Sequence, residues 1–114
     1  MMEKSKKTGM NTVKTRHFAM IHKELEKACK KHPKFCDELT ALDMGTVKAA
    51  ELSFKLVNSE APYQADMILQ EEIYEAIAAY KQGDKKHCLQ ELAQCGAVIL
   101  RMMQFVQDEM EARK

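Results

Sequence analysis

The sequence has few residues that break helices. Of its 114 residues, only two are proline and four are glycine. It also lacks a series of short segments in which polar and apolar residues alternate, the pattern typical of β-strands. Alanine, leucine, lysine, glutamate and methionine are plentiful instead, and all of them favour helices. The composition therefore predicts an all-α protein.

Long apolar runs and an excess of charge of one sign are also missing. No stretch reaches the roughly 18 apolar residues needed to cross a bilayer. The basic N-terminal residues are not followed by the apolar segment of a signal peptide, so we expect a cytoplasmic protein with no membrane partner. The formal net charge is only +1, which does not indicate a strongly basic nucleic-acid binder.

The remaining composition is that of one small folded domain. Hydrophobic residues make up 46% and charged residues 31%, which indicates a globular chain and not a disordered one. We interpret residues 1–11, which are polar and basic, as a flexible N-terminus. Residues 12–114 are expected to form a single helical domain, long enough for a modest core.

Apolar residues at helical spacing predict four helices. His32-Pro33 should end the first helix, because a residue before proline avoids helical angles. Asp43 or Thr46 can cap the second. Helices of these lengths favour a four-helix bundle. The expected helices cover about residues 12–31, 44–59, 62–82 and 85–111.

The apolar stripes of these helices are the expected core. Glu51 and Lys55, four residues apart in the second helix, are expected as an ion pair on its exposed side. Gly96 is expected to allow close approach of a neighbouring helix. The stripes comprise Phe18, Ile21, Leu25 and Ala28; Val47, Ala50, Phe54 and Val57; Leu69, Ile73, Ala76, Ile77 and Tyr80; and Leu89, Leu92, Gly96, Ile99, Met103 and Val106.

A tight turn should join the third and fourth helices. Gly83 is a suitable C-terminal cap for the third helix, and Asp84 is a suitable N-cap for the fourth. Because the connection is so short, the two helices must be antiparallel neighbours. The sequence therefore predicts a helical hairpin centred on Gly83.

Acidic residues face one another across this hairpin. Glu75 and Glu91 each lie eight residues from Gly83, and Glu72 and Gln94 each lie eleven residues from it. At about 1.5 Å of rise per residue, each pair sits at one level, roughly 12 Å and 16 Å from the turn. Acidic helix faces are usually solvated, but clustered like charges repel unless a cation lies between them. Three carboxylates and one amide would suit Mg²⁺ or Mn²⁺.

Other site chemistries find little support. No Glu-x-x-His motif of di-iron bundles occurs, and there is no glycine-rich phosphate loop and no Gly-x-Ser-x-Gly turn. The four cysteines, Cys29, Cys36, Cys88 and Cys95, contain no Cys-x-x-Cys pair, and we expect them to be reduced and partly buried. A partial zinc site at Cys29, His32 and Cys36 is the alternative for the first pair.

The segments LQEEIYEA, residues 69–76, and ELAQCGAV, residues 91–98, resemble the MazG-like family of all-α nucleoside triphosphate pyrophosphohydrolases. The family pattern is Glu-x-x-Glu followed after a gap by Glu-x-x-Asp. Glu72, Glu75 and Glu91 match it, whereas Gln94 stands where the family usually has aspartate. The run around Gln94 is similar to a phage- or prophage-type branch. The resemblance covers roughly residues 62 to 106.

The resemblance implies a fold, a reaction and an assembly. The fold would be a bundle-like MazG-type arrangement of helices. Mg²⁺ or Mn²⁺ held by Glu72, Glu75, Glu91 and Gln94 would bind a (d)NTP, and water would release the (d)NMP and pyrophosphate. Glu71 is the candidate for positioning or deprotonating that water. Family members are commonly dimers or tetramers, so a homo-oligomer is expected. The alternative is a non-catalytic binding or assembly module with the same fold, which Gln94 favours because an amide cannot act as a base.

Overall fold

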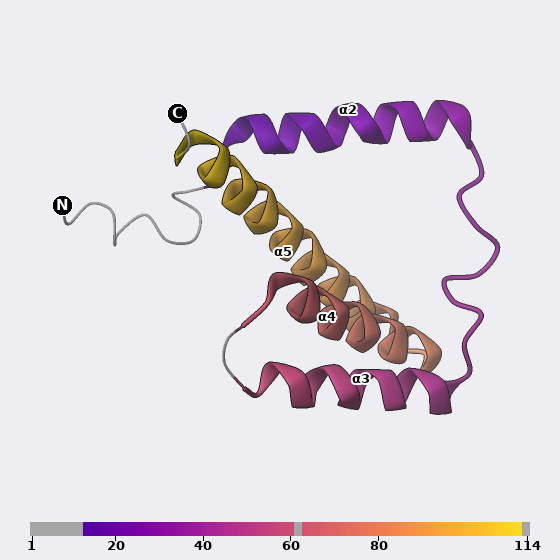
Figure 1. The fold of residues 1–114 in the computed structure, drawn as a ribbon. Coiled ribbons are helices and arrows are strands. Elements are labelled where there is room, and N and C mark those ends of the chain that lie inside the picture. The colour runs from indigo at the N-terminus through magenta and orange to yellow at the C-terminus, as the bar shows by residue number, and fades with distance from the viewer. Residues whose placement is uncertain (1–12, 61–62, 113–114) are drawn as a thin grey trace. The chain divides into compact units, whose positions relative to one another are not determined.

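A computed structural model describes residues 13–60 and 63–112 of the chain (Figure 1). Within these residues all regular secondary structure is helical, which confirms the all-α prediction. No helix in this part of the chain has both the length and the apolar character to cross a membrane. The predicted flexible segment 1–11 and Pro62 lie outside the described residues. The helices are α2 (Thr15–Lys31), α3 (Met44–Asn58), α4 (Ala65–Lys81) and α5 (Lys85–Ala112).

The helix boundaries follow the local signals in the sequence. The Asp43 carboxylate accepts a hydrogen bond from the Thr46 backbone N–H at 2.7 Å, and so caps α3. At the end of α2, His32 leaves the helical region with φ −133° and ψ 79°, as expected before Pro33. Each predicted helix is confirmed, with its ends shifted by no more than three residues.

The chain divides into two compact units. The first unit combines Met1–Cys36 with Leu100–Lys114, and the second unit comprises Asp37–Ile99. Helix α2 belongs to the first unit, α3 and α4 belong to the second, and α5 begins in the second and ends in the first. The expectation of a single domain over residues 12–114 stays a prediction.

The second unit contains the predicted hairpin of α4 and the first half of α5. Gly83 adopts a φ of +86°, in the left-handed region that glycine tolerates best. Its N–H donates to the Tyr80 carbonyl at 3.0 Å, and the Asp84 N–H donates to the Ala79 carbonyl at 2.9 Å. The Asp84 side chain then accepts from the His87 N–H at 3.0 Å. The two helices therefore run antiparallel, as expected (Figure 1).

Helix α3 packs against α4 in the same unit. The rings of Phe54 and Tyr74 stack with their centroids 5.7 Å apart. Val47 on α3 is fully buried, and small side chains, Ala76, Ala79 and Cys88, form a cluster against which Leu39 packs. Ala76 and Ala79 of α4 therefore lie against Cys88 of α5 in the core of this unit.

The buried line of α5 differs from the predicted stripe. In the second unit it consists of Cys88, Glu91 and Cys95, spaced by three and four residues as one helix face requires. The predicted stripe residues Leu89 and Leu92 are 70% and 39% exposed. The face is thus rotated by one position, because the hairpin sets which side of α5 meets the small residues of α4. This rotation places a carboxylate in the buried face.

Several other burial predictions were wrong. Glu51, expected on the solvent side of α3, is only 9% exposed, and Gly96 has no neighbour within 4 Å of the position that a Cβ would take. Within residues 13–60 and 63–112, no close approach therefore requires glycine at position 96. Besides Leu89 and Leu92, the apolar stripe residues that the structure leaves exposed are Phe18, Ile21, Leu25, Ala28, Val57, Tyr80, Ile99 and Val106.

Candidate metal centre

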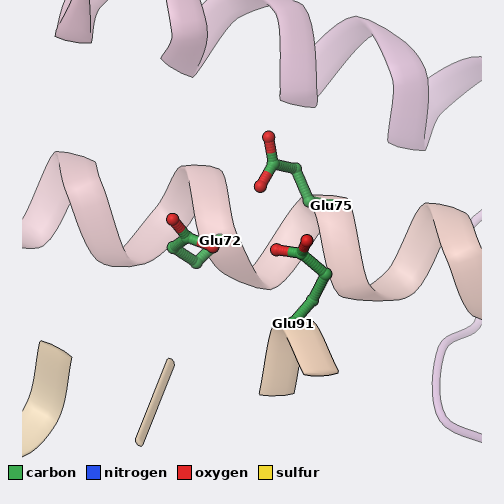
Figure 2. Close-up of side chains that lie close together, drawn as sticks. All are labelled: Glu72, Glu75 and Glu91. Carbon is green, nitrogen blue, oxygen red and sulfur yellow. The ribbon is translucent and has the colours of Figure 1, made fainter. Parts of the chain in front are cut away.

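Three carboxylates meet between α4 and α5. Glu72 and Glu75 are three residues apart on one face of α4, and Glu91 approaches from α5 (Figure 2). One carboxylate oxygen from each residue lies within 4.8 Å of the others. We call these residues the glutamate cluster. Among the described residues, this is the one group of three or more His, Cys, Asp or Glu side chains close enough to hold a metal ion.

The glutamate cluster contains oxygens that are buried and unsatisfied. Glu91 is only 9% exposed, since it lies on the α5 face between Cys88 and Cys95. Its Oε1 atom is buried without a hydrogen-bond partner, and so is Oε1 of Glu72. A buried polar atom without a partner is costly, and a water, an ion or a ligand bound there would satisfy it. These two oxygens therefore fit a site for a cation.

The carboxylates of the glutamate cluster have shifted pKa values. Burial raises the pKa of Glu72 from 4.5 to about 7, helped by a hydrogen bond with Glu91 and by the charges of Glu75, Glu91 and Glu71. Burial and Glu91 also raise the pKa of Glu75. For Glu91, burial is the largest influence and acts upward, but hydrogen bonds from Glu72, His87 and Glu75 together lower its pKa. The raised pKa of Glu72 thus favours its protonated form up to near neutral pH.

Two basic side chains contact the glutamate cluster within the described part of the chain. His87 Nε2 lies 3.0 Å from Glu91 Oε2, one helical turn away on α5. Lys55 Nζ, on α3, lies 3.6 Å from Glu75 Oε2 and 3.1 Å from Glu51 Oε2. The four-residue spacing of His87 and Glu91 was a signal in the sequence. The contact between Lys55 and Glu75 had none, because the two residues lie on different helices.

Glu71, the candidate water-binding residue, is held by α3. Asn58 Nδ2 lies 2.9 Å from Glu71 Oε1 and 2.9 Å from the Met67 carbonyl oxygen, and donates to both. Glu71 is half-buried, and its charge contributes to the raised pKa values of Glu72 and Glu75. A hydrogen bond of this kind fixes the Glu71 carboxylate beside the cluster.

Gln94 is placed differently from the three glutamates. It follows Glu91 by three residues on α5, and its side chain is exposed. Cys95, four residues after Glu91, occupies the next buried position instead. The role of Gln94 as a fourth ligand therefore stays a prediction.

The cysteines form no second centre among the described residues. All four are free, with Cys88 and Cys95 buried and Cys29 and Cys36 exposed. Cys29, His32 and Cys36 are not among the groups close enough to hold a metal ion. Burial raises the pKa of the Cys88 and Cys95 thiols, which makes thiolate formation less favourable.

The chain was compared with protein-family models, with curated proteins and with solved structures, and none of them matches. Functional inference therefore depends on the chemistry of the glutamate cluster and on the motif that contains it.

Proposed function

We propose that this chain is a MazG-like, metal-dependent nucleoside triphosphate pyrophosphohydrolase that cleaves a (d)NTP to the (d)NMP and pyrophosphate. The observation that carries the proposal is the glutamate cluster, in which three carboxylates lie within 4.8 Å of one another and two of their oxygens are buried without partners. The order and spacing of Glu72, Glu75 and Glu91 in the family motif support the same conclusion.

The donor set of the glutamate cluster fits Mg²⁺ or Mn²⁺. All three ligands are carboxylates, and hard divalent cations prefer oxygen donors. Such an ion, when bound, neutralises phosphate charge and makes water a stronger nucleophile. Glu72, Glu75 and Glu91 would hold the ion, with Gln94 as the proposed fourth ligand. Binding of the ion would displace the proton that the raised pKa of Glu72 favours near neutral pH.

The proposed role of Glu71 is to orient and deprotonate the attacking water. Asn58 binds Glu71 Oε1, which leaves the second oxygen as the one to accept the water proton. The oxygen of the water forms a bond to phosphorus at the α–β linkage, and the bridging P–O bond breaks. The products are the nucleoside monophosphate and pyrophosphate.

The proposal includes the MazG-type bundle, a cytoplasmic location and a homo-oligomer, either dimer or tetramer. Exposed apolar residues of α5 in the second unit support assembly: Leu89, Leu92 and Ile99 are 70%, 39% and 40% exposed. Apolar side chains at helical spacing are suited to packing against another copy of the chain.

The test is pyrophosphate release from a panel of ribo- and deoxyribonucleoside triphosphates, with Mg²⁺ and with Mn²⁺. We expect metal-dependent release by the wild type and a loss of more than about 100-fold in Glu75→Gln, which keeps the side-chain volume but removes the charge. Circular dichroism and thermal unfolding show whether both proteins are folded. Release that persists in Glu75→Gln, or that does not need a metal, would contradict the proposal.

The alternative is a non-catalytic binding or assembly module that retains the fold. The exposed Gln94, in place of the family's aspartate, is the observation that favours it. A folded wild type that binds Mn²⁺ but releases no pyrophosphate from any nucleotide would support this alternative.

A further inference from the structure

A lysine from the neighbouring helix lies at the edge of the glutamate cluster. Lys55 Nζ is 3.6 Å from Glu75 Oε2, within the second unit. The Lys55 side chain is 46% exposed, so its ammonium group remains accessible to solvent and to a ligand. In the metal-free protein it partly neutralises the cluster from the α3 side.

Lys55 is held at this edge by a second carboxylate. Glu51, one turn earlier on α3, has a side chain only 12% exposed, and its Oε2 lies 3.1 Å from Lys55 Nζ. The other oxygen, Oε1, lies 3.4 Å from Lys48 Nζ. A mostly buried carboxylate between two lysines holds Lys55 in place even when Glu75 is engaged elsewhere.

A cation bound at the glutamate cluster would change the electrostatic interactions of Lys55. If Glu75 held a divalent ion, the Lys55 ammonium, 3.6 Å from Glu75 Oε2, would be repelled by the charge of that ion. An anion that contacts both charges removes the repulsion. We infer that Lys55 binds a phosphate oxygen of the polyphosphate chain at the cluster, so that Lys55 and the divalent ion hold the substrate together. This inference rests on the proposed function.

Lys48 provides a matched control for Lys55. Both lysines pair with Glu51 and both are about half exposed, but only Lys55 also contacts Glu75. Lys55→Gln and Lys48→Gln therefore each remove one positive charge from α3, and each removes one ion-pair partner of Glu51. They differ in the contact with the cluster.

The experiment measures two affinities by calorimetry: that of Mn²⁺ alone, and that of the Mn²⁺ complex of inorganic tripolyphosphate in excess Mn²⁺. We expect Lys55→Gln to weaken tripolyphosphate binding about tenfold, the effect of losing one charge-assisted hydrogen bond. The same variant should bind Mn²⁺ alone as tightly as the wild type or more tightly, since a competing cation is gone. Lys48→Gln should stay within about twofold on both measurements, and Lys55→Arg should restore tripolyphosphate binding.

Four results would overturn the inference. Equal tripolyphosphate affinity of Lys55→Gln and Lys48→Gln would show that Lys55 does not contact the phosphates. Parallel loss of Mn²⁺ and tripolyphosphate binding in Lys55→Gln would indicate a structural role. A wild type that binds Mn²⁺ but not the tripolyphosphate complex would leave the metal site standing and refute the role of Lys55, whereas a wild type that binds no Mn²⁺ would refute the proposed function as well.

Discussion

Asn58 at the end of α3 donates a hydrogen bond to Glu71 on α4, with 2.9 Å between Nδ2 and Oε1. The same amide nitrogen donates to the Met67 carbonyl oxygen, so one side chain joins the end of α3 to two positions of α4. We expect Asn58→Ala to lower the free energy of unfolding by about 1–2 kcal/mol, because both acceptors lose a half-buried donor. Chemical denaturation measures this change.

Asn58→Ala also distinguishes the proposed role of Glu71 from that of the metal ligands. Asn58 donates to Glu71 and Met67 and not to a metal ligand, so Asn58→Ala should change Mn²⁺ affinity by less than about threefold while it reduces pyrophosphate release. Loss of Mn²⁺ binding in this variant would mean that Asn58 supports the glutamate cluster as a whole. Unchanged release would argue against a catalytic role for Glu71.

Removing the charge of Glu91 should abolish metal binding while preserving the helices. Glu91 is the most buried member of the glutamate cluster, and its Oε1 atom is buried without a hydrogen-bond partner. We expect Glu91→Gln to weaken Mn²⁺ binding at least about 100-fold, because the ion loses a charged oxygen ligand. Glu109→Gln, on an exposed position of α5, is the control and should bind Mn²⁺ normally. Equal affinity of the two variants would exclude Glu91 as a ligand.

The raised pKa values predict how stability depends on pH. The pKa of Glu72 is raised from its ordinary value of 4.5 to about 7 in the folded protein. At a pH between these two values, Glu72 binds a proton in the native state and loses it on unfolding. The pKa of Glu75 is raised as well. Stability from these groups is present below pH 4.5 and is lost as the pH rises through 7. The pKa of Glu91 is lowered, so this residue makes stability increase with pH, but only below its ordinary pKa of 4.5.

We therefore expect the Tm of metal-free protein in EDTA to fall by about 5 °C between pH 5 and pH 8. Saturating Mn²⁺ should raise the Tm more at pH 8 than at pH 5, because the ion must displace protons at low pH. Glu72→Gln should flatten the metal-free profile. A Tm that climbs with pH in EDTA over this range would contradict the assigned electrostatics.

Two glycines should respond to alanine in opposite directions. Gly83 has a φ of +86°, so Gly83→Ala is strained although no atom lies within 4 Å of the added Cβ, and we expect a loss of about 1 kcal/mol. Gly96 is inside α5 and equally open, so Gly96→Ala should gain about 0.5–1 kcal/mol from helix propensity. Thermal unfolding of the two variants compares them directly. Destabilisation by Gly96→Ala would restore the prediction of a close helix contact there.

Gln94→Asp tests the departure from the family motif. If Gln94 belongs to the ligand set, a carboxylate at this position should tighten Mn²⁺ binding about tenfold and increase pyrophosphate release. Since the Gln94 side chain is exposed, the change should leave the Tm of the metal-free protein nearly unaltered. Release that appears only in Gln94→Asp would identify the wild type as the non-catalytic module, and an unchanged Mn²⁺ affinity would exclude position 94 from the site.

Much of the fold follows from local chemistry that the sequence displays. Helix ends depend on neighbouring residues, which is why Asp43, the His32-Pro33 pair and Gly83 located them to within a few residues. The glutamate cluster was also predictable, because a short turn forces equal distances along two antiparallel helices and so brings Glu91 to the level of Glu75.

Tertiary packing decided what lies around the cluster. Periodicity shows that a helix has an apolar face, but it does not say which face meets a partner. In α5 the buried line runs through Cys88, Glu91 and Cys95 and not through the leucines, because the small residues of α4 accept it. The contact of Lys55 with Glu75 and that of Asn58 with Glu71 join residues 20 and 13 positions apart on different helices. No spacing rule within one helix could place these contacts, since they depend on how α3 packs against α4.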